Sequence, residues 1–144
     1  MPGGLLEGRI LVEVALALIQ RKGRWLVSRR APGRVFEGLW EFPGGACRPD
    51  ELPTETASRE ALEEVGLAVR AVGSMDPVET AHAGQQFRLH LIRCAAKHGN
   101  ARPSDPAIVE VRWVDLEELK RLPMPPANAA IVARIAAAAQ REAQ

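Results

Sequence analysis

The segment from Pro53 to Val65 constrains the fold of this chain more than any other stretch of its sequence. Pro53 suits the first turn of a helix, where a missing N–H costs nothing, and the acidic Glu55 interacts favourably with the helix dipole in that same turn. Gly66 stands where a residue in the left-handed conformation commonly ends a helix. These signals predict a helix over residues 53–65.

Short apolar or alternating segments lie on both sides of this helix and predict strands. In residues 86–94, Phe87, Leu89 and Leu91 alternate with polar residues, which places the three on one face. The predicted strands are residues 10–19, 24–29, 67–72, 86–94 and 108–114, the first two joined by a turn at 21–23.

Two further helices are predicted towards the C-terminus. Asp115 is placed to cap a short helix over residues 115–121. A longer helix over residues 128–141 buries one apolar face, made of Ile131, Val132 and Ile135. Strands that mix with two principal helices predict an α/β chain, a sandwich of helix, sheet and helix.

Composition and charge limit the class of protein. The 144 residues are 47% hydrophobic and 26% charged, which is typical of one globular domain, here residues 1–144. A chain of this length buries about two-thirds of its unfolded surface. The 19 basic and 18 acidic side chains nearly cancel, so the broad positive field of a nucleic-acid polymer binder is missing. A small anionic ligand needs only local charge.

The cysteines and the apolar first segment indicate where the chain works. Cys47 and Cys94 lack the spacing of a zinc site or disulfide framework, which favours a reducing compartment. Residues 10–19 have the length of a signal-peptide core, but they contain Glu13 and are too short for a membrane span. We therefore expect a strand here, a cytoplasmic protein and no membrane partner.

Three glutamates stand on one face of the central predicted helix. Glu60, Glu63 and Glu64 occupy positions i, i+3 and i+4. Like charges at this spacing repel, so the carboxylates either point into water or are held together by a cation. Oxygen ligands are what Mg²⁺ and Mn²⁺ prefer. The helix alone is compatible with a solvated acidic face or a metal site.

The residues around these glutamates distinguish the two alternatives. Five residues separate Gly45 from Glu51, and seven more lead to the run REALEEVGL, residues 59–67. This arrangement resembles the Nudix box, GX5EX7REUXEEXGU, in which U is a bulky aliphatic residue, and all seven fixed letters are in register. Ala61 departs from the pattern at a U position, which affects packing rather than chemistry.

The resemblance implies a fold and a reaction. Nudix hydrolases are sandwiches around a mixed β-sheet, and they cut a diphosphate linked to another moiety with a divalent metal, here Mg²⁺ with Mn²⁺ as the alternative. Glu51 would fasten the loop to the helix, and Arg59 would orient Glu60 through a charge-assisted pair. The metal ligands that the resemblance implies are Glu60, Glu63, Glu64 and the backbone carbonyl of Gly44.

The sequence leaves the general base open. In relatives of the MutT type a glutamate precedes the strand tryptophan by six residues, but that place is Ala107 here. Glu110, three residues before Trp113, is the first candidate. The alternatives are Asp105, Glu60 and Glu64.

Three stretches outside the box narrow the resemblance to MutT-type pyrophosphohydrolases. They are the residues SRR at 28–30, GLWEFPGG at 38–45 and PPAN at 125–128. Such proteins remove 8-oxo-dGTP from the nucleotide pool, a DNA-repair role. The resemblance implies a substrate pocket formed by Arg30, Phe42, Leu89 and Asn128. An Asn amide can donate and accept at the purine edge, and oxidation at C8 turns N7 from acceptor to donor. Asn128 also has an alternative role as a helix N-cap.

The expected reaction is Mg²⁺-dependent hydrolysis of 8-oxo-dGTP to 8-oxo-dGMP and pyrophosphate, by a monomer or homodimer acting on small nucleotides. Ala46, Arg48 and Asp50 depart from the GGKxExGE pattern of many relatives, which leaves other substrates open. These are CTP or methylated pyrimidine nucleotides, ADP-ribose and dinucleoside polyphosphates. A non-catalytic nucleotide-binding module is the alternative from another class, although such modules typically lose box carboxylates.

Overall fold

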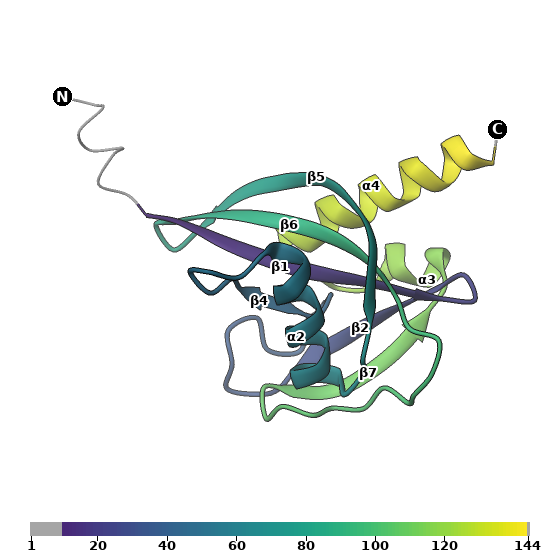
Figure 1. Cartoon of the computed structure of the whole chain (residues 1–144), viewed down its shortest axis with the longest axis horizontal. Coiled ribbons are helices and arrows are strands. Elements are labelled where there is room, and N and C mark those ends of the chain that lie inside the picture. The colour runs from purple at the N-terminus through teal and green to yellow at the C-terminus, as the bar shows by residue number, and fades with distance from the viewer. Residues whose placement is uncertain (1–9, 144) are drawn as a thin grey trace.

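The computed structural model describes residues 10–143 (Figure 1). Their elements, in chain order, are β1 (Leu11–Arg21), β2 (Arg24–Arg30), β3 (Trp40–Glu41), β4 (Gly44–Ala46), α2 (Pro53–Val65), β5 (Arg70–His82), β6 (Gln85–Ala95), β7 (Ile108–Val114), α3 (Leu116–Arg121) and α4 (Pro126–Glu142).

The strands form one mixed sheet. Its strand order is β3-β2-β1-β6-β5, with β4 added beside β1 and β7 beside β2. β1 runs parallel to β6 along almost its whole length, and the other strand pairs are antiparallel. β2 pairs with β1 only next to their turn, at Gln20 and Arg21, and β4 takes the same edge of β1 further along, at residues 14–16.

Helices cover both faces of this sheet, as the α/β sandwich predicts (Figure 1). Because strand side chains alternate, β1 contributes to two separate cores. Its residues Ala15, Ala17 and Ile19 pack with α2, whereas Leu16 and Leu18 pack with α3 and α4. The chain has therefore folded into a three-layered arrangement in which α2 and α4 lie on opposite sides of β1.

Small side chains let α2 approach the sheet closely. Ala57 and Ala61 of the helix are fully buried in the same core as Ala15 and Ala17 of β1. Ala61 is the residue that departs from the aliphatic pattern of the box. Its small size is matched by small residues on the facing strand, so the departure leaves a packed interface.

The predicted helices and most strands are confirmed. The central helix spans residues 53–65 as predicted, and Gly66 ends it with a φ of 71°. Asp115 caps α3 by accepting a hydrogen bond from the Glu118 N–H at 2.9 Å. Residues 11–21 form a strand, as expected for the apolar first segment. No helix within residues 10–143 combines the length and apolarity that crossing a membrane requires.

The prediction for β5 was wrong. Residues 67–72 were expected to form the strand, but it runs from Arg70 to His82. This edge strand shifts register between Ala71 and Gly73 and again between Met75 and Val78, around Pro77. Such bulges break the alternation that marks a strand in a sequence. Pairing with β6 therefore decides its length.

Candidate active site

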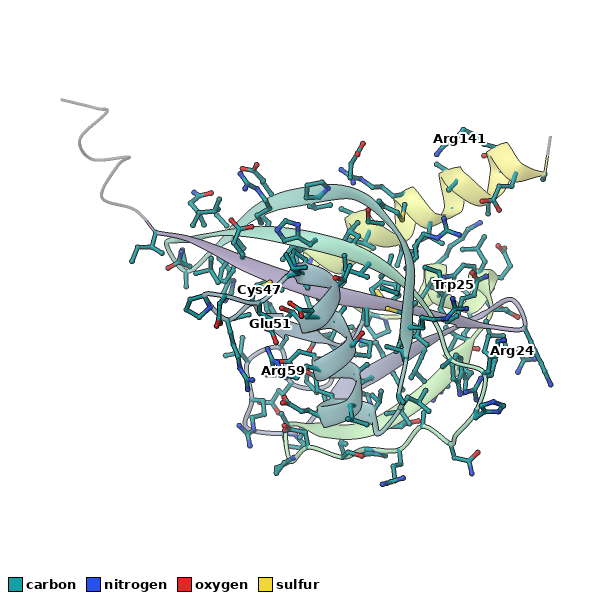
Figure 2. The ribbon with its side chains drawn as sticks, in the orientation of Figure 1. Arg24, Trp25, Cys47, Glu51, Arg59 and Arg141 are labelled. Carbon is teal, nitrogen blue, oxygen red and sulfur yellow. The ribbon has the colours of Figure 1, made fainter. Side chains whose placement is uncertain are left out.

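Arg59 of α2 is the centre of a hydrogen-bonded network that includes Glu51 (both are labelled in Figure 2). Its Nε donates to Glu51 Oε2 at 2.7 Å and its Nη2 donates to Glu51 Oε1 at 2.9 Å. Its Nη1 donates to Glu60 Oε1 at 2.9 Å. The hydrogen bonds that Arg59 donates hold the pKa of Glu51 far below its usual range, and the same bonds to Glu51 and Glu60 raise the pKa of Arg59. Arg59 thus fixes one oxygen of Glu60.

Glu51 ties the loop before α2 to the helix, as expected. Besides the two bonds from Arg59, its Oε1 accepts the Thr56 hydroxyl at 2.7 Å and the Arg48 backbone N–H at 3.1 Å. Thr56 is fully buried. Residue 56 is one of the seven positions between Glu51 and Arg59 at which the box allows any amino acid, so no sequence pattern indicates its role. Its hydroxyl completes the support of Glu51 from inside the helix.

Two glycines let β4 pass between β1 and the glutamates of α2. A Cβ on Gly45 would lie 2.6 Å from Oε1 of Glu60, and a Cβ on Gly44 would clash with the backbone of Ala15 and Leu16. The Gly44 N–H donates to Glu64 Oε1 at 3.4 Å. The absence of side chains here brings the β4 backbone next to the carboxyl groups of Glu60 and Glu64.

We call Glu60, Glu63 and Glu64 of α2 the acidic group. Glu41 of β3 meets Glu60 and Glu64 beside these glycines. Burial raises the pKa of Glu64, as do its hydrogen bond with Glu60 and the charges of Glu60 and Glu41. Burial also raises the pKa of Glu41, against the charge of Arg30. Sequence reasoning missed Glu41, and its only signal was its place in the WEFPGG run. Crowded, part-buried carboxylates of this kind are stabilised by a cation, and an all-oxygen set fits Mg²⁺ or Mn²⁺.

Glu63 lies on the solvent side of this group. Its carboxylate is 3.3 Å from Arg59 Nη1, and its side chain is half exposed. Among residues 10–143, no three acidic, histidine or cysteine side chains already surround a common metal position. Joint coordination with Glu60 and Glu64 would therefore require Glu63 to turn away from Arg59.

The structure places Glu110 on the other face of the sheet. Val111 and Trp113 of β7 pack in the α2 core, so the alternating Glu110 faces away from α2. Its carboxylate lies 3.1 Å from Arg112 Nη2 and 3.0 Å from Arg29 Nη2. Hydrogen bonds from Arg112 and then Arg29 lower the pKa of Glu110. This geometry does not bring it to the α2 glutamates.

Asp105, the other candidate from outside the helix, is engaged in its own loop. Its Oδ1 accepts the Ala107 N–H at 2.8 Å, and its backbone carbonyl accepts the Ile108 N–H at 2.9 Å. These bonds shape the turn that leads into β7. The geometry gives Asp105 a role in that turn.

The four predicted substrate residues line one pocket of about 530 Å³, here called the Phe42 pocket. Arg30, Phe42, Leu89 and Asn128 come from β2, the β3–β4 segment, β6 and α4. Apolar walls are added by Val14 and Leu16 of β1, Phe87 of β6 and residues 125–127. Glu41, Gly44 and Gly45 line it too, so the Phe42 pocket opens onto the acidic group.

Asn128 presents an amide of fixed orientation to this pocket. Its Oδ1 accepts the Phe42 backbone N–H at 3.2 Å, and the side chain is buried. A backbone N–H can only donate, so the oxygen must face Phe42 and the Nδ2 amino group is left as the donor. The alternative N-cap role was wrong, because Pro125 occupies that position of α4.

The Arg30 side chain lies at the rim of the Phe42 pocket, where it contacts Glu41 and Val35. Its Nε lies 3.3 Å from Glu41 Oε1 and donates to the Val35 carbonyl at 3.3 Å. The Phe42 side chain is 2% exposed and belongs to the core on the α4 face. Phe42 is therefore both a core residue and a wall of the pocket.

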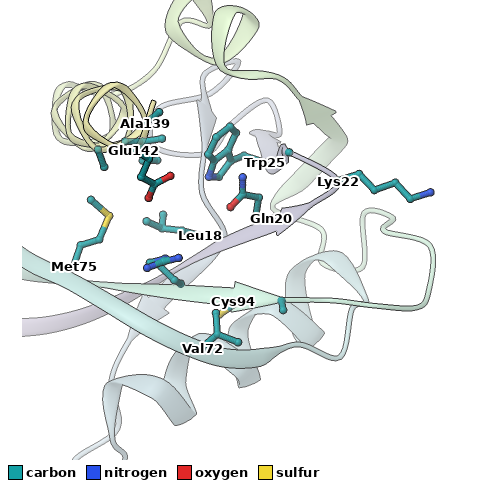
Figure 3. A pocket seen from close by; sticks show the side chains of 14 residues that line it. Leu18, Gln20, Lys22, Trp25, Val72, Met75, Cys94, Ala139 and Glu142 are labelled. Atoms are coloured by element: carbon teal, nitrogen blue, oxygen red, sulfur yellow. The ribbon is translucent and has the colours of Figure 1, made fainter. Parts of the chain in front are cut away.

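A second cleft, of about 490 Å³, lies at the other end of α4 (Figure 3). Trp25, Gln20 and Met75 line it, with Ala139 and Glu142 of α4. Within residues 10–143 its lining includes none of the predicted site residues. Trp25 therefore belongs to a different part of the surface from the Phe42 pocket.

Known proteins match most of this chain. The family model of the NUDIX domain matches residues 10–135. A CTP pyrophosphohydrolase from Escherichia coli is 30% identical over 119 residues, which cover 82% of this chain and 86% of that protein. An 8-oxo-dGTP diphosphatase from Buchnera aphidicola is 28% identical over 100 residues, which cover 69% of this chain and 79% of that protein.

Solved structures give the same result. The solution structure of the ORF135 protein of E. coli superimposes with a TM-score of 0.78 at 26% identity. The alignment covers 91% of this chain and 92% of that one. The shared fold thus extends over most of both chains.

Proposed function

The chain belongs to the Nudix family and is one of its pyrophosphohydrolases, and we propose that it acts on 8-oxo-dGTP, giving 8-oxo-dGMP and pyrophosphate. One observation carries the proposal: the Phe42 pocket and the acidic group share the segment 41–45. A nucleotide whose base enters the pocket then has its phosphates at the carboxylates of α2.

Asn128 would read the base. Its free Nδ2 can donate to a purine O6, and the second lone pair of Oδ1 can accept an N7–H, which 8-oxoguanine has and guanine lacks. A buried polar group left unpaired by the wrong substrate discriminates strongly. Arg30 and Leu89 would complete the recognition, the first at the rim and the second on the apolar wall.

Nudix hydrolases generally use divalent metal ions, usually Mg²⁺. We assign the ion to Glu60, Glu63, Glu64 and the Gly44 carbonyl, whose oxygen donors suit it. When bound, the ion supplies water activation and charge neutralisation at the phosphates. Arg59 holds Glu60 at 2.9 Å, and the bare backbone of Gly45 leaves room for that carboxylate.

The general base is proposed to be Glu60 or Glu64. Both lie at the β4 glycines, where the phosphates would be bound. Glu110 is paired with two arginines on the other face of the sheet, and Asp105 shapes its own turn. Separate amide variants, Gln at Glu60, Glu64 and Glu110 and Asn at Asp105, compared by kcat, test this assignment: a large loss at Glu110 alone would overturn it.

The decisive experiment is pyrophosphate release from 8-oxo-dGTP, dGTP, CTP, dCTP and ADP-ribose, with and without Mg²⁺. The proposal expects metal-dependent release, with the highest kcat/KM for 8-oxo-dGTP and a monophosphate as the second product. A higher kcat/KM for another nucleotide would reject the substrate and leave the family chemistry in place. Nucleotide binding with no product would favour the non-catalytic module.

CTP is the second candidate substrate. The E. coli relative with that activity in its name is slightly more similar to this chain, at 30% identity, than the Buchnera 8-oxo-dGTP diphosphatase, at 28%. Cytosine offers acceptors at O2 and N3 to the Nδ2 donor of Asn128. Competition between CTP and 8-oxo-dGTP in one reaction separates the two candidates directly.

We further propose a cytoplasmic monomer or homodimer that supports DNA repair by cleaning the nucleotide pool. Light scattering of the purified protein measures its oligomeric state. A raised frequency of A·T to C·G mutations in a deletion strain, restored by the wild-type gene and not by Glu60→Gln, would support the repair role. An unchanged mutation frequency would contradict it.

A further inference from the structure

We propose that Phe36 and His82 form an aromatic clamp that closes the open side of the Phe42 pocket and stacks on the base of the bound substrate. This inference rests on the proposed function, because it assumes that a nucleobase enters that pocket. It adds two residues that the sequence motifs do not mark, from the loop between β2 and β3 and from the end of β5.

The two rings meet across the pocket. Their centroids are 4.9 Å apart and their planes are inclined by 47°. Aromatic rings attract one another at such distances in tilted arrangements. Both residues line the Phe42 pocket together with Arg30 and Asn128. A contact between two distant segments thus forms part of the pocket wall itself.

Phe36 is held in an unusual conformation. Its φ is 61°, in the left-handed region that bulky residues rarely adopt. The surrounding loop is fixed by hydrogen bonds: the Leu39 N–H donates to the Phe36 carbonyl at 3.1 Å, and the Arg30 side chain donates to the Val35 carbonyl. Backbone strain that neighbouring bonds maintain is typical of functional positions. Here it directs the ring to the pocket.

His82 stands on an equally defined support. It is the last residue of β5 and pairs with Gln85 across a two-residue turn. Both turn residues, Ala83 and Gly84, have positive φ, as in the tight turns that hairpins prefer. The Gln85 side chain also donates to the carbonyl of Ile10, the residue before β1. The histidine ring is therefore presented by a braced hairpin.

The exposed fractions of Phe42, Phe36 and His82 indicate which of these rings can stack on a base. Phe42 is buried in the core and can offer the pocket only an edge or a small part of its ring. Phe36 is part-exposed and His82 is exposed. Open ring faces at a pocket mouth are suited to stacking on a planar base, which is worth roughly 5- to 160-fold in affinity per base.

The test compares Phe36→Ala and His82→Ala with the wild type in KM and kcat for the preferred nucleotide. Each variant is expected to raise KM about tenfold with kcat within about twofold, since the clamp holds the base and not the reacting phosphates. Phe36→Trp and His82→Phe keep a ring and should restore KM. Glu37→Ala, an exposed neighbour in the same loop, is the matched control.

Calorimetric titration of the matching monophosphate and of ribose 5-phosphate, without metal, gives a readout independent of turnover. The clamp predicts that the wild type binds the monophosphate more tightly than ribose 5-phosphate. Phe36→Ala should remove most of this difference in Kd. Melting temperatures exclude unfolded variants. Unchanged Kd and KM in both alanine variants overturn the clamp and leave the proposed function intact. Base-dependent binding that Phe36→Ala weakens, with no hydrolysis of any triphosphate, rejects the proposed substrate and supports the clamp.

Discussion

The acidic group on α2 and the Phe42 pocket are built in opposite ways. The acidic group is held by charged hydrogen bonds such as those from Arg59 to Glu51 and Glu60, and its residues are close in sequence. The Phe42 pocket combines β2, β6 and α4 with the β3–β4 segment, mainly through apolar walls. The chemistry is therefore a local property of one loop and helix, whereas substrate choice depends on how distant segments pack.

Their shared segment explains why both can work on one substrate. Residues 41–45 give the pocket Glu41 and Phe42 and bring Gly44 and Gly45 to the carboxylates. The bond from the Phe42 N–H to Asn128 connects this segment to α4. Changes in the acidic group should alter kcat with little effect on specificity, and changes in the pocket should do the reverse.

The largest effect is expected from Glu60→Gln. The amide keeps the volume of the side chain but loses the charge beside Gly45 and Arg59, so kcat should fall on the order of 10³-fold. The ratio of kcat/KM values between two nucleotides should stay unchanged. Steady-state kinetics with Mg²⁺ and a melting curve measure both. Glu117→Gln, on the exposed side of α3, is the control; full activity of Glu60→Gln would remove Glu60 from the chemistry.

Asn128 tests the pocket in the same way. Asn128→Asp keeps an acceptor for the Phe42 N–H but loses the Nδ2 donor, so preference among bases should change by roughly 10- to 100-fold. Asn128→Ala should lose the same preference and, in addition, about 1–3 kcal/mol of stability, because the Phe42 N–H loses its partner. Substrate-panel kinetics and chemical denaturation separate the two effects. An unaltered preference in both variants would contradict base reading by Asn128.

Glu51→Gln should affect the reaction indirectly, through Arg59. The variant weakens the two-point contact with Arg59, which positions Glu60, and losses of such supporting contacts typically cost 10- to 100-fold. The loss should appear in kcat and not in nucleotide preference. Asp50→Asn, the exposed acidic neighbour, is the matched control. Equal kcat in the Glu51 variant and the wild type would show that Arg59 needs no support.

Thr56→Val isolates the buried hydroxyl of that network. The substitution keeps the shape of the side chain and removes the 2.7 Å bond to Glu51, which should cost about 1 kcal/mol of stability. We expect only a few-fold loss in kcat, because Arg59 still holds Glu51. Thr54→Val, exposed two residues earlier, is the control in urea denaturation. Equal midpoints for the two variants would argue against the network.

The smallest effect is a pH dependence of stability. The pKa of Glu51 is lowered in the folded protein, so the unfolded chain takes up its proton first as the pH falls. The contribution of Glu51 is therefore full above about pH 5, decreases as the pH passes through the unfolded value of about 4.3, and is lost below the folded pKa. Melting temperatures measured from pH 7 to 2 should fall more steeply in the wild type than in Glu51→Gln. Parallel curves would contradict this.

Secondary structure was predictable where its causes are local. Pro53 and Gly66 mark the ends of α2, and Asp115 caps α3, because capping depends on neighbouring residues alone. β5 was not predictable beyond Val72, since its bulges follow the pairing with β6. The sequence shows which residues of β7 share a face, because side chains alternate along a strand. It does not show that α2 covers the face opposite Glu110.

The sequence by itself determined the acidic helix, its glycine-rich approach and the family, because a fixed spacing on a helix sets which carboxylates share a face. Only the tertiary structure decided that Glu41 joins those carboxylates, that Asn128 turns its oxygen to Phe42, and that Phe36 meets His82. These contacts join residues far apart in the chain. Their geometry follows from the register of the sheet and the packing of α4, which no local pattern encodes.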